Sequence, residues 1–485
     1  MSNRKQTSTL WAALLAAGLA AGGPHSAVGG QAGAQKPADA KSKPANPAGG
    51  KSTTSKPVGP RPLEFLIEQH KLENGLRVIL SVDHSAPVFS ICVTYDVGSR
   101  NEPPGHTGFA HLFEHLMFQG SENVGKGEHF LLVLNNGGGM NGTTNEDRTN
   151  YFEELPANQL DLALFLEADR MRRLAVNQSN LDNQRAAVKE ERRLGIDNQP
   201  YGPTDEALSD ILYDNFAYKH SVIGSMADLD SAKLEDFQDF YRLYYAPNNA
   251  VLTLVGDFNP QNALAKIKKY FGGFPSQPTP PRPDLSEPPQ AAERRRRMDD
   301  TFAQTPRLDQ LYKVSLGDTA EWFAVQTISG ILGWGESSRL YQRLVKEKEL
   351  AVGVETDLEN RPGPSPFQIE VSLRPGGDFA AVEQIVQEEL ERLQSQPVAA
   401  WELEKVRLTS RRQRAQRLRS SLSRAILIGD STAKFGDPGL INTFEKRLNA
   451  VTPQDVQRAA QKYLGKNQRS IIETYPKQAA SGGAQ

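Results

Sequence analysis

Two segments of this 485-residue chain repeat one pattern at a constant spacing of 219 positions. The first covers residues 234–245 and leads into an apolar run over 250–255, and the second covers 453–464 and leads into 470–472. Each segment has the periodicity of an amphipathic helix followed by a strand. A tandem duplication explains both at once, whereas the alternative is two unrelated helix–strand units. We therefore expect two homologous halves.

The composition is that of an ordinary globular protein, with 38% hydrophobic and 24% charged residues and a net charge of −2. This length is sufficient for two or more domains with full cores. The near-neutral charge argues against nucleic acid as the main partner. The basic run from Arg294 to Arg297 lies in a proline-dense stretch, 275–298, and is expected to be a solvated patch of a linker.

The N-terminus is typical of an export signal. Arg4 and Lys5 precede an apolar run over 10–21, which is followed by small residues that fit a cleavage site. We expect a signal peptide over 1–34 and a disordered Lys/Pro/Ala-rich tether over 35–60. The protein would then be exported, periplasmic or extracellular, with no stable membrane anchor because the apolar run is too short to span a bilayer. The alternative is a flexible N-terminus on a cytosolic protein.

The rest of the chain alternates strand and helix patterns. Asn74-Gly75 predicts a hairpin between strands at 65–72 and 76–82. Further strands are expected at 88–97, 143–155, 250–255 and 367–373, and helices at 157–175, 179–194, 234–245, 337–348, 379–394 and 400–426. These patterns predict a first domain over 61–274, a Pro/Arg-rich linker over 275–298, a second domain over 299–476 and a flexible tail over 477–485.

The most informative motif is H-x-x-E-H, from His111 to His115. On a helix, two histidines four apart share one face with Glu114. Neighbouring residues are apolar nearly all round, so this helix should be buried, with Thr107 as its N-cap and Gly120 at its end. Two histidines and a glutamate buried without partners would be costly, and a metal ion removes that cost. The alternative is an accidental match.

A zinc hydrolase needs three protein ligands and one open position. All eight histidines fall at or before His220 and Cys92 is the only cysteine, so the second half cannot build a usual zinc site. The best third ligand is one of two adjacent acids, Glu190 and Glu191, in the helix expected at 179–194. Spacing does not choose between them, and the alternative for either acid is a solvated helix face.

The motif and its surroundings resemble the pitrilysin/insulinase family of inverzincin metallopeptidases, in particular bacterial members similar to mitochondrial processing peptidase. Glu191 follows His115 by 76 positions, and further matching stretches are 141–152, 197–202, 222–225, 244–249 and 337–340. The resemblance covers residues 62 to 475 and favours Glu191 over Glu190. We expect an α+β fold of two homologous domains from tandem duplication, each an antiparallel sheet packed with helices.

The resemblance implies a zinc-dependent endopeptidase in which His111, His115 and Glu191 hold one Zn²⁺ per chain. The ion would lower the pKa of its bound water. Glu114 would take the proton of that water and pass it to the leaving amine. Gln184, seven positions before Glu191, stands where the family often has a glutamate, and its amide would act through hydrogen bonds.

The resemblance also implies how substrate binds. Asn141, Gly142, Thr143, Thr144 and Asn145 would form an edge strand beside the zinc, to which an extended peptide adds through main-chain hydrogen bonds. An ordinary edge strand is the alternative. Peptides or unfolded segments would be drawn into an enclosed space between the halves, and folded proteins would be excluded.

The second half departs from the family pattern at two positions. Family members that work alone carry an arginine and a tyrosine where this chain has Val345 and Val352, which donate no hydrogen bond. We therefore expect a heterodimer with a zinc-free homologue that supplies the arginine–tyrosine pair. The alternative is that Arg339 or Arg343 serves instead.

Two rival functions remain open. The chain could be a catalytically inactive family member that acts as a structural subunit, although Glu114 argues against this because a scaffold needs no base. It could also be a peptide-binding subunit with a structural zinc. Structural zinc sites usually have four protein ligands, and the sequence offers three good ones.

Overall fold

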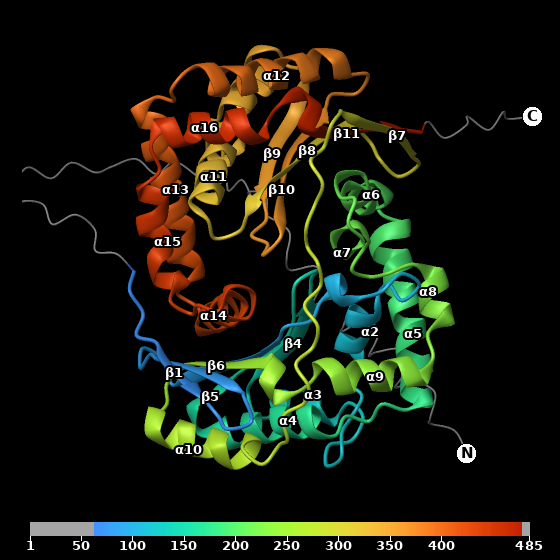
Figure 1. Cartoon of the computed structure of the whole chain (residues 1–485), viewed down its shortest axis with the longest axis vertical. Helices are drawn as coiled ribbons and strands as arrows, with labels where there is room; N and C mark the ends of the chain where they lie inside the picture. Colours follow the sequence, from blue (N-terminus) through green and yellow to red (C-terminus); the bar gives the residue numbers. More distant parts are fainter. Residues whose placement is uncertain (1–62, 478–485) are drawn as a thin grey trace, which may run out of the picture. The chain divides into compact units, whose positions relative to one another are not determined.

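The computed structural model describes residues 63–477, which form two β-sheets with helices packed against them (Figure 1). The first sheet has the strand order β1-β2-β6-β3-β5-β4 and the second has the order β7-β11-β8-β10-β9. The strands are β1 (Glu68–Lys71), β2 (Arg77–Val82), β3 (Val88–Tyr95), β4 (Gly139–Thr144), β5 (Thr149–Pro156), β6 (Ala250–Gly256), β7 (Arg294–Asp300), β8 (Arg307–Leu316), β9 (Ala351–Leu358), β10 (Pro364–Leu373) and β11 (Arg469–Pro476).

Helices cover these sheets. Those of the first half are α2 (Phe109–Leu116), α3 (Glu128–Asn135), α4 (Leu160–Arg172), α5 (Gln178–Arg192), α6 (Gly202–Leu212), α7 (Phe216–Lys219), α8 (Met226–Ser231), α9 (Leu234–Tyr244) and α10 (Pro260–Phe271). Those of the second half are α11 (Ala320–Gly333), α12 (Phe379–Ser395), α13 (Ala400–Arg417), α14 (Ser421–Phe435), α15 (Leu440–Asn449) and α16 (Pro453–Tyr463). Within residues 63–477, no helix has the length and apolar character needed to cross a membrane. The expected signal peptide (1–34), the tether (35–60) and all of the tail except Lys477 lie outside the described residues.

The repeated segments occupy the same place in the two sheets. α9, the 3-10 turn Pro247–Asn249 and β6 recur 219 positions later as α16, the 3-10 turn Lys466–Gln468 and β11. β6 lies between β2, to which it is parallel, and β3, to which it is antiparallel; β11 lies in the same way between β7 and β8. The expected α+β fold of two homologous domains is confirmed. Each sheet carries one parallel pair, because its last strand returns beside an early strand after a long connection.

The two halves exchange one helix each. α6 of the first half packs against β7, β8 and β11, whereas α14 of the second half packs against β3 and β6 (Figure 1). Hydroxyl pairs join both helices to the sheets they cover, Thr204 to Thr474 at 2.8 Å and Ser421 to Ser90 at 2.9 Å. At Gly429 of α14, a Cβ would lie 2.6 Å from Thr94 Oγ1, so glycine permits this close approach. The halves are therefore interlocked.

The single strand expected over 143–155 is wrong. The structure has two antiparallel strands, β4 and β5, joined by a turn at residues 145–148. The side-chain oxygen of Asn145 accepts hydrogen bonds from the backbone N–H groups of Asp147 and Arg148, both at 2.9 Å. This Asx-type turn ends the alternating pattern that the sequence suggested.

The linker expected over 275–298 ends earlier than predicted, because the arginine run belongs to β7. This strand lies at the edge of the second sheet, parallel to β11. Arg295 pairs with Glu383, and Arg296 pairs with Asp210 at 2.7 Å. The run is thus an edge strand whose charged side chains are neutralised by neighbouring carboxylates, a common feature of exposed sheet edges.

The helix expected over 400–426 is also divided, into α13 and α14. The side chain of Ser420 accepts a hydrogen bond from the backbone N–H of Ser423 and so caps α14. The expected helix at 337–348 contains a π-helical segment, Tyr341–Glu347. The amphipathic pattern runs through the break between α13 and α14 because both helices are partly buried.

Candidate metal centre

Helix α2 carries the H-x-x-E-H motif and is buried along its whole length. It begins after Gly108, whose φ of 88° is in the left-handed region that favours glycine. The carboxylate of Glu102 accepts hydrogen bonds from the backbone N–H groups of Gly108 (2.9 Å) and Ala110 (2.7 Å), which have no partner inside the helix. The expectation that Thr107 caps the helix is wrong, because its hydroxyl donates to Asp228 instead. Sequence spacing gave no signal for Glu102.

Three predicted ligands lie together at the contact between α2 and α5. Nε2 of His115 is 3.2 Å from one carboxylate oxygen of Glu191, and Nε2 of His111 is 3.7 Å from the other. The ring centres of the two imidazoles are 4.9 Å apart, and the rings are inclined at 73°. The three side chains each offer a ligand atom within 4.8 Å of the other two. The Nε2 atoms of the two imidazoles therefore both face the carboxylate of Glu191.

Of the two adjacent acids in α5, only Glu191 lies beside the imidazoles. The side chain of Glu190 is 58% exposed and pairs with Arg193 at 3.0 Å. Glu191 is 23% exposed and contacts both histidines. The helix turns the two neighbours about 100° apart, so that one faces α2 and the other faces solvent.

These residues fit a zinc ion in their chemistry as well as their positions. Burial and the neighbouring His115 lower the pKa of His111, so its ring is neutral at pH 7, the form that ligates metals. Burial would raise the pKa of Glu191, but the hydrogen bond from His115 and the charges of both rings outweigh it and lower that pKa. Nδ1 of each ring is buried with no hydrogen-bond partner in the described chain. Two imidazoles and one carboxylate are the ligand set of zinc peptidases such as thermolysin.

Glu114 lies beside this cluster, on the side of strand β4. Its side chain is buried, and its Oε2 accepts a hydrogen bond of 2.6 Å from the hydroxyl of Thr144. At Gly142, a Cβ would lie 3.0 Å from Cγ of Glu114, so the backbone of β4 passes close to this carboxylate. The predicted base is therefore held between the helix and the strand.

The predicted edge strand is present as β4, which pairs with β5 alone and ends the first sheet. Asn141, Gly142, Thr143 and Thr144 belong to it, whereas Asn145 lies in the turn that follows. The prediction that Asn145 belongs to this strand is wrong, because the side chain of Asn145 forms hydrogen bonds within the turn.

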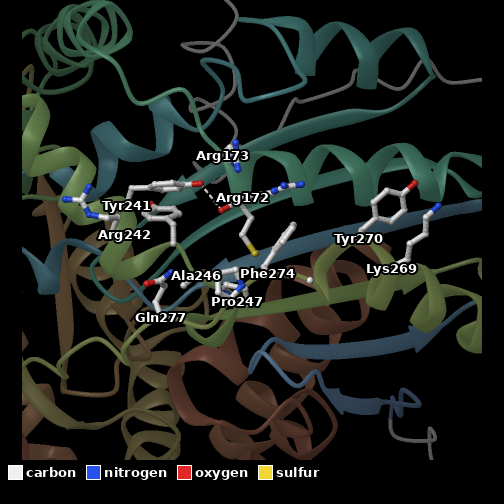
Figure 2. A pocket seen from close by; sticks show the side chains of 14 residues that line it. Arg172, Arg173, Tyr241, Arg242, Ala246, Pro247, Lys269, Tyr270, Phe274 and Gln277 are labelled. Carbon is white, nitrogen blue, oxygen red and sulfur yellow. Dashed lines mark hydrogen bonds between the residues drawn. The ribbon is translucent and has the colours of Figure 1, made fainter.

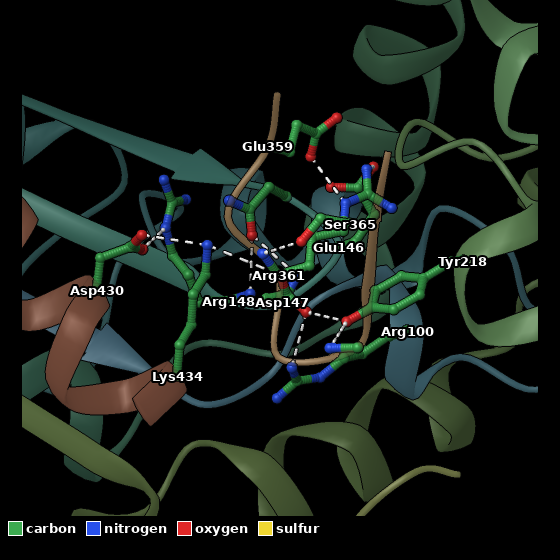
Figure 3. Close-up of polar contacts among 12 residues, drawn as sticks. Arg100, Glu146, Asp147, Arg148, Tyr218, Glu359, Arg361, Ser365, Asp430 and Lys434 are labelled. Carbon is green, nitrogen blue, oxygen red and sulfur yellow. Dashed lines mark hydrogen bonds and ion pairs between the residues drawn. The ribbon is translucent and has the colours of Figure 1, made fainter. Parts of the chain in front are cut away.

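The turn at 145–148 is held by both halves of the chain (Figure 3). Asp147, 2% exposed, accepts hydrogen bonds from Arg100 at 2.7 Å and from the hydroxyl of Tyr218 at 2.8 Å. Arg361, at the β9–β10 connection, pairs with Glu146 at 2.7 Å. On the other side, Asp430 of α14 pairs with Arg148 at 2.7 Å and Lys434 lies 3.7 Å from Asp147. Sequence reasoning missed these contacts, although the polar run 145–148 interrupts the strand pattern there.

Gln184 lies next to His115, about two turns of α5 before Glu191 and on the same face of the helix. It is 5% exposed, its amide nitrogen donates to Asn183 at 2.7 Å, and its oxygen has no partner that meets hydrogen-bond geometry in the described chain. Burial lowers the pKa of His115, but Glu191, Glu114 and Gln184 together raise it. The glutamine thus contributes to the polar surroundings of a predicted ligand.

The two second-half positions that depart from the family pattern are both valines, so neither can donate a side-chain hydrogen bond. Val352 is 53% exposed on β9, and Val345 packs against the second core. Arg339 pairs with Glu402 at 2.7 Å, and Arg343 pairs with Glu388 at 2.7 Å. Both arginines are thus occupied by helices of their own half.

A second buried cluster in the first half joins His129, Glu153, Glu167 and Arg170. His129 Nε2 lies 2.6 Å from Glu153, and Arg170 forms an ion pair with Glu167. The three acid and imidazole groups are close enough to hold a metal. Burial raises the pKa of both Glu153 and Glu167 to about 7, and Arg170 already supplies a positive charge. This cluster is therefore better explained as a charge-balanced part of the core.

A pocket of about 600 Å³ lies where the C-terminal ends of α4, α9 and α10 meet (Figure 2). Its basic side chains stand in or next to the last turns of these helices, where cations interact favourably with the helix dipole. Arg173 pairs with Glu122 at 3.0 Å, and Arg242 pairs with Asp239. None of its lining residues belongs to the metal cluster, and the arrangement is explained by helix termination.

The comparisons with known proteins agree with this geometry. The profile described as insulinase (peptidase family M16) matches residues 77–225, and the profile described as peptidase M16 inactive domain matches residues 231–409. The chain is 29% identical over 412 residues to a protein named zinc protease PqqE from Helicobacter pylori, covering 84% of this chain and 93% of that protein.

Solved structures show the same fold. A crystal structure of a protease from Helicobacter pylori aligns with a TM-score of 0.81 at 29% identity, over 85% of this chain and all of that one. The first half of the periplasmic protease PqqL from Escherichia coli aligns with a TM-score of 0.70 at 19% identity, over 85% of this chain and 92% of that one. The second match supports the fold alone.

Proposed function

Because this chain belongs to the insulinase (M16) family of peptidases, we propose that it is a zinc-dependent endopeptidase that hydrolyses peptides or unfolded segments. The observation that carries the proposal is the convergence of His111, His115 and Glu191, with the charge of a fourth group, the Glu114 carboxylate, acting on both rings. The name of its relative, a zinc protease, supports the same metal.

The chemistry follows from the positions of these residues. Zinc held by His111, His115 and Glu191 would supply Lewis acidity that acidifies a water molecule and polarises the scissile carbonyl. Glu114 takes the proton of that water and returns it to the leaving amine. The Thr144 hydroxyl holds Oε2 of Glu114, and no hydrogen bond from the described chain occupies Oε1. One oxygen is thus fixed while the other is available for proton transfer.

Substrate binds as a strand added to β4. This strand has a partner on one side only, so its other edge offers main-chain groups to an extended peptide. The close approach of Gly142 to Glu114 brings such a peptide past the base. Arg148 donates to the carbonyl of Thr143 at 2.8 Å and so ties the turn to the end of β4.

The chain works outside the cytoplasm and together with a second subunit. Export is supported by Arg4 and Lys5 ahead of the apolar run 10–21. The partner is a zinc-free homologue that supplies the arginine–tyrosine pair missing at Val345 and Val352. The ion pairs of Arg339 and Arg343 leave neither free to substitute without losing its own partner.

The alternative is a catalytically inactive subunit with a structural or peptide-binding role. The profile that matches residues 231–409 describes an inactive domain, but it begins after all the groups of the metal cluster. The rivals differ in what Glu114 does, because only a peptidase needs a base beside the metal.

The variant Glu114→Gln separates the two. We expect it to lower peptide hydrolysis by 10²–10⁴-fold, roughly the usual contribution of general acid–base catalysis, while zinc content and peptide binding persist. Glu190→Gln, on the exposed face of α5, is the matched control and should leave hydrolysis unchanged. Wild-type protein that is loaded with zinc and supplied with its partner, yet cleaves nothing in a mixed peptide library, would instead establish the inactive alternative.

A further inference from the structure

The second half contains a cavity of about 330 Å³ at the meeting point of α11, α13, α14 and α15. About half of its lining residues are apolar, and these include Trp322, Trp334, Leu358, Leu418, Leu427 and Phe444. The volume is at the lower end of the range for small-molecule sites. The cavity shares no residue with the metal cluster, and nothing in the proposed function uses it.

Two arginines of α13 line this cavity. Arg414 and Arg417 are three positions apart and so lie on one face of the helix. The guanidinium carbon of Arg414 is 4.3 Å from the ring centre of Phe444, and its Nη2 donates to the carbonyl of Ile441 at 2.9 Å. That carbonyl is the one acceptor that the described chain gives to Arg414, so most of its N–H donors are unused.

In the described part of the chain, neither arginine of the cavity has an ion-pair partner, although the charge of Glu445 acts on Arg414 from farther away. No carboxylate within residues 63–477 forms an ion pair with Arg414 or Arg417, and Asp318, which also lines the cavity, is paired with Arg447. Burial and the adjacent charge of Arg417 outweigh the opposing charge of Glu445 and lower the pKa of Arg414 to about 10. Arg414 is partly buried and Arg417 is exposed, so an anion placed between them would be attracted by both charges.

We propose that this cavity binds an apolar carboxylate, with the carboxylate between the guanidinium groups of Arg414 and Arg417 and the apolar part against Trp322, Trp334 and Phe444. Arginine suits this role because its planar donors match the two oxygens of a carboxylate. The same chemistry is offered by a free aromatic acid and by the C-terminal residue of a peptide. Binding there requires no peptide hydrolysis.

The cavity contains two of the four tryptophans of the chain, so binding to the metal-loaded full-length protein can be followed by tryptophan fluorescence and calorimetry. The probes are 4-phenylbutyrate and N-acetylphenylalanine, each compared with its neutral amide. We expect saturable binding of at least one acid, with its amide at least tenfold weaker. Binding of phenylbutyrate alone identifies free acids as the ligand, and binding of N-acetylphenylalanine alone identifies peptide ends.

Variants locate the binding. Arg414→Gln and Arg417→Gln should each raise the dissociation constant at least tenfold, and the exposed Arg417 provides the test if the Arg414 variant folds poorly. Arg412 is exposed on the same helix outside the cavity, so Arg412→Gln should leave the dissociation constant unchanged. His111→Ala should also leave it unchanged, which separates this site from carboxylate binding at the metal and from failure of the proposed function. Equal binding of acid and amide, no saturable binding, or binding that ignores both arginine variants would overturn the proposal.

Discussion

The hydroxyl of Thr144, on strand β4, donates a hydrogen bond of 2.6 Å to the carboxylate of Glu114, on helix α2. Thr144 is itself 3.3 Å from the hydroxyl of Thr149, which donates to the carbonyl of Val97 at 2.9 Å. The strand proposed to receive the peptide therefore also orients the proposed base. Proton transfer and peptide alignment depend on one element.

Removal of this hydroxyl should slow the reaction without preventing peptide binding. A hydrogen bond to a charged group contributes about 1.5–3 kcal/mol, so we expect Thr144→Val to lower kcat by roughly 10- to 100-fold with little change in KM. Thr144→Ser keeps the hydroxyl and should retain most of the activity. Steady-state kinetics on both variants tests this, and equal kcat for the valine variant and the wild type would contradict it.

The two adjacent acids of α5 provide a matched test of the metal site. Glu191→Gln removes the charged oxygen that faces His111 and His115, and we expect zinc affinity to fall by more than about tenfold, since even residues that only support ligands have effects of that size. Glu190→Gln should bind zinc as the wild type does, because its side chain pairs with Arg193 at the surface. Zinc competition with a chromophoric chelator measures both. Equal loss in the two variants would show that Glu191 is not a ligand.

Of the residues in the turn after β4, Asp147 should contribute most to the unfolding free energy. Asp147→Asn removes one of the two carboxylates that pair with Arg100, which is 8% exposed, and leaves Asp96 as the other. Complete loss of a buried ion pair typically costs about 3–5 kcal/mol, so we expect a smaller loss of unfolding free energy, about 1–3 kcal/mol. The control is Asp299→Asn, whose pair with Arg297 is exposed and should contribute less than about 0.5 kcal/mol. Urea unfolding followed by circular dichroism compares them, and similar midpoints would argue against a structural role for the turn.

Acid should weaken the attachment of α14 to the first half. Burial would raise the pKa of Asp83, but hydrogen bonds from Arg424 and Ser85 and the charge of Arg424 outweigh it and lower that pKa to about 2. Because the pKa of an unfolded aspartate is about 3.9, the ionised group stabilises the fold above pH 4 and loses this effect as the pH falls towards 2.

The variant Asp83→Asn isolates that contribution. Its unfolding free energy should be lower than that of the wild type at pH 6, and the difference should shrink between pH 4 and pH 2. Asp239→Asn, at a side chain that is 70% exposed, serves as the reference for general acid effects. A difference that stays constant across this range would exclude the linkage.

Part of the site could be predicted because its signals are local. Helical periodicity alone brings His111, Glu114 and His115 near one face of α2. The Asn74-Gly75 pair predicted the β1–β2 hairpin, which the register of Lys71 opposite Arg77 bears out. The repeat at 219 positions likewise predicted two equivalent helix–strand units, because duplicated sequences keep the same pattern of burial.

Other features depended on contacts that no local pattern contains. The sequence predicts a linker where the structure has strand β7. A run of arginines such as Arg294–Arg297 is typical of a solvated segment, and only the folded chain brings carboxylates of α6 and α12 beside it. The Thr144–Glu114 bond joins residues 30 positions apart, and it exists because β4 packs against α2.

The sequence by itself determined the two-fold repeat, the spacing of the histidines on one helix and the absence of histidine from the second half, since each is a property of neighbouring or duplicated residues. The tertiary structure alone decided that Glu102 rather than Thr107 caps α2 and that α6 and α14 exchange halves, and it placed Glu191, which helix spacing could not separate from Glu190, beside the imidazoles. These outcomes depend on which surfaces pack together across long sequence separations, and packing selects among side chains that are equivalent in the linear pattern.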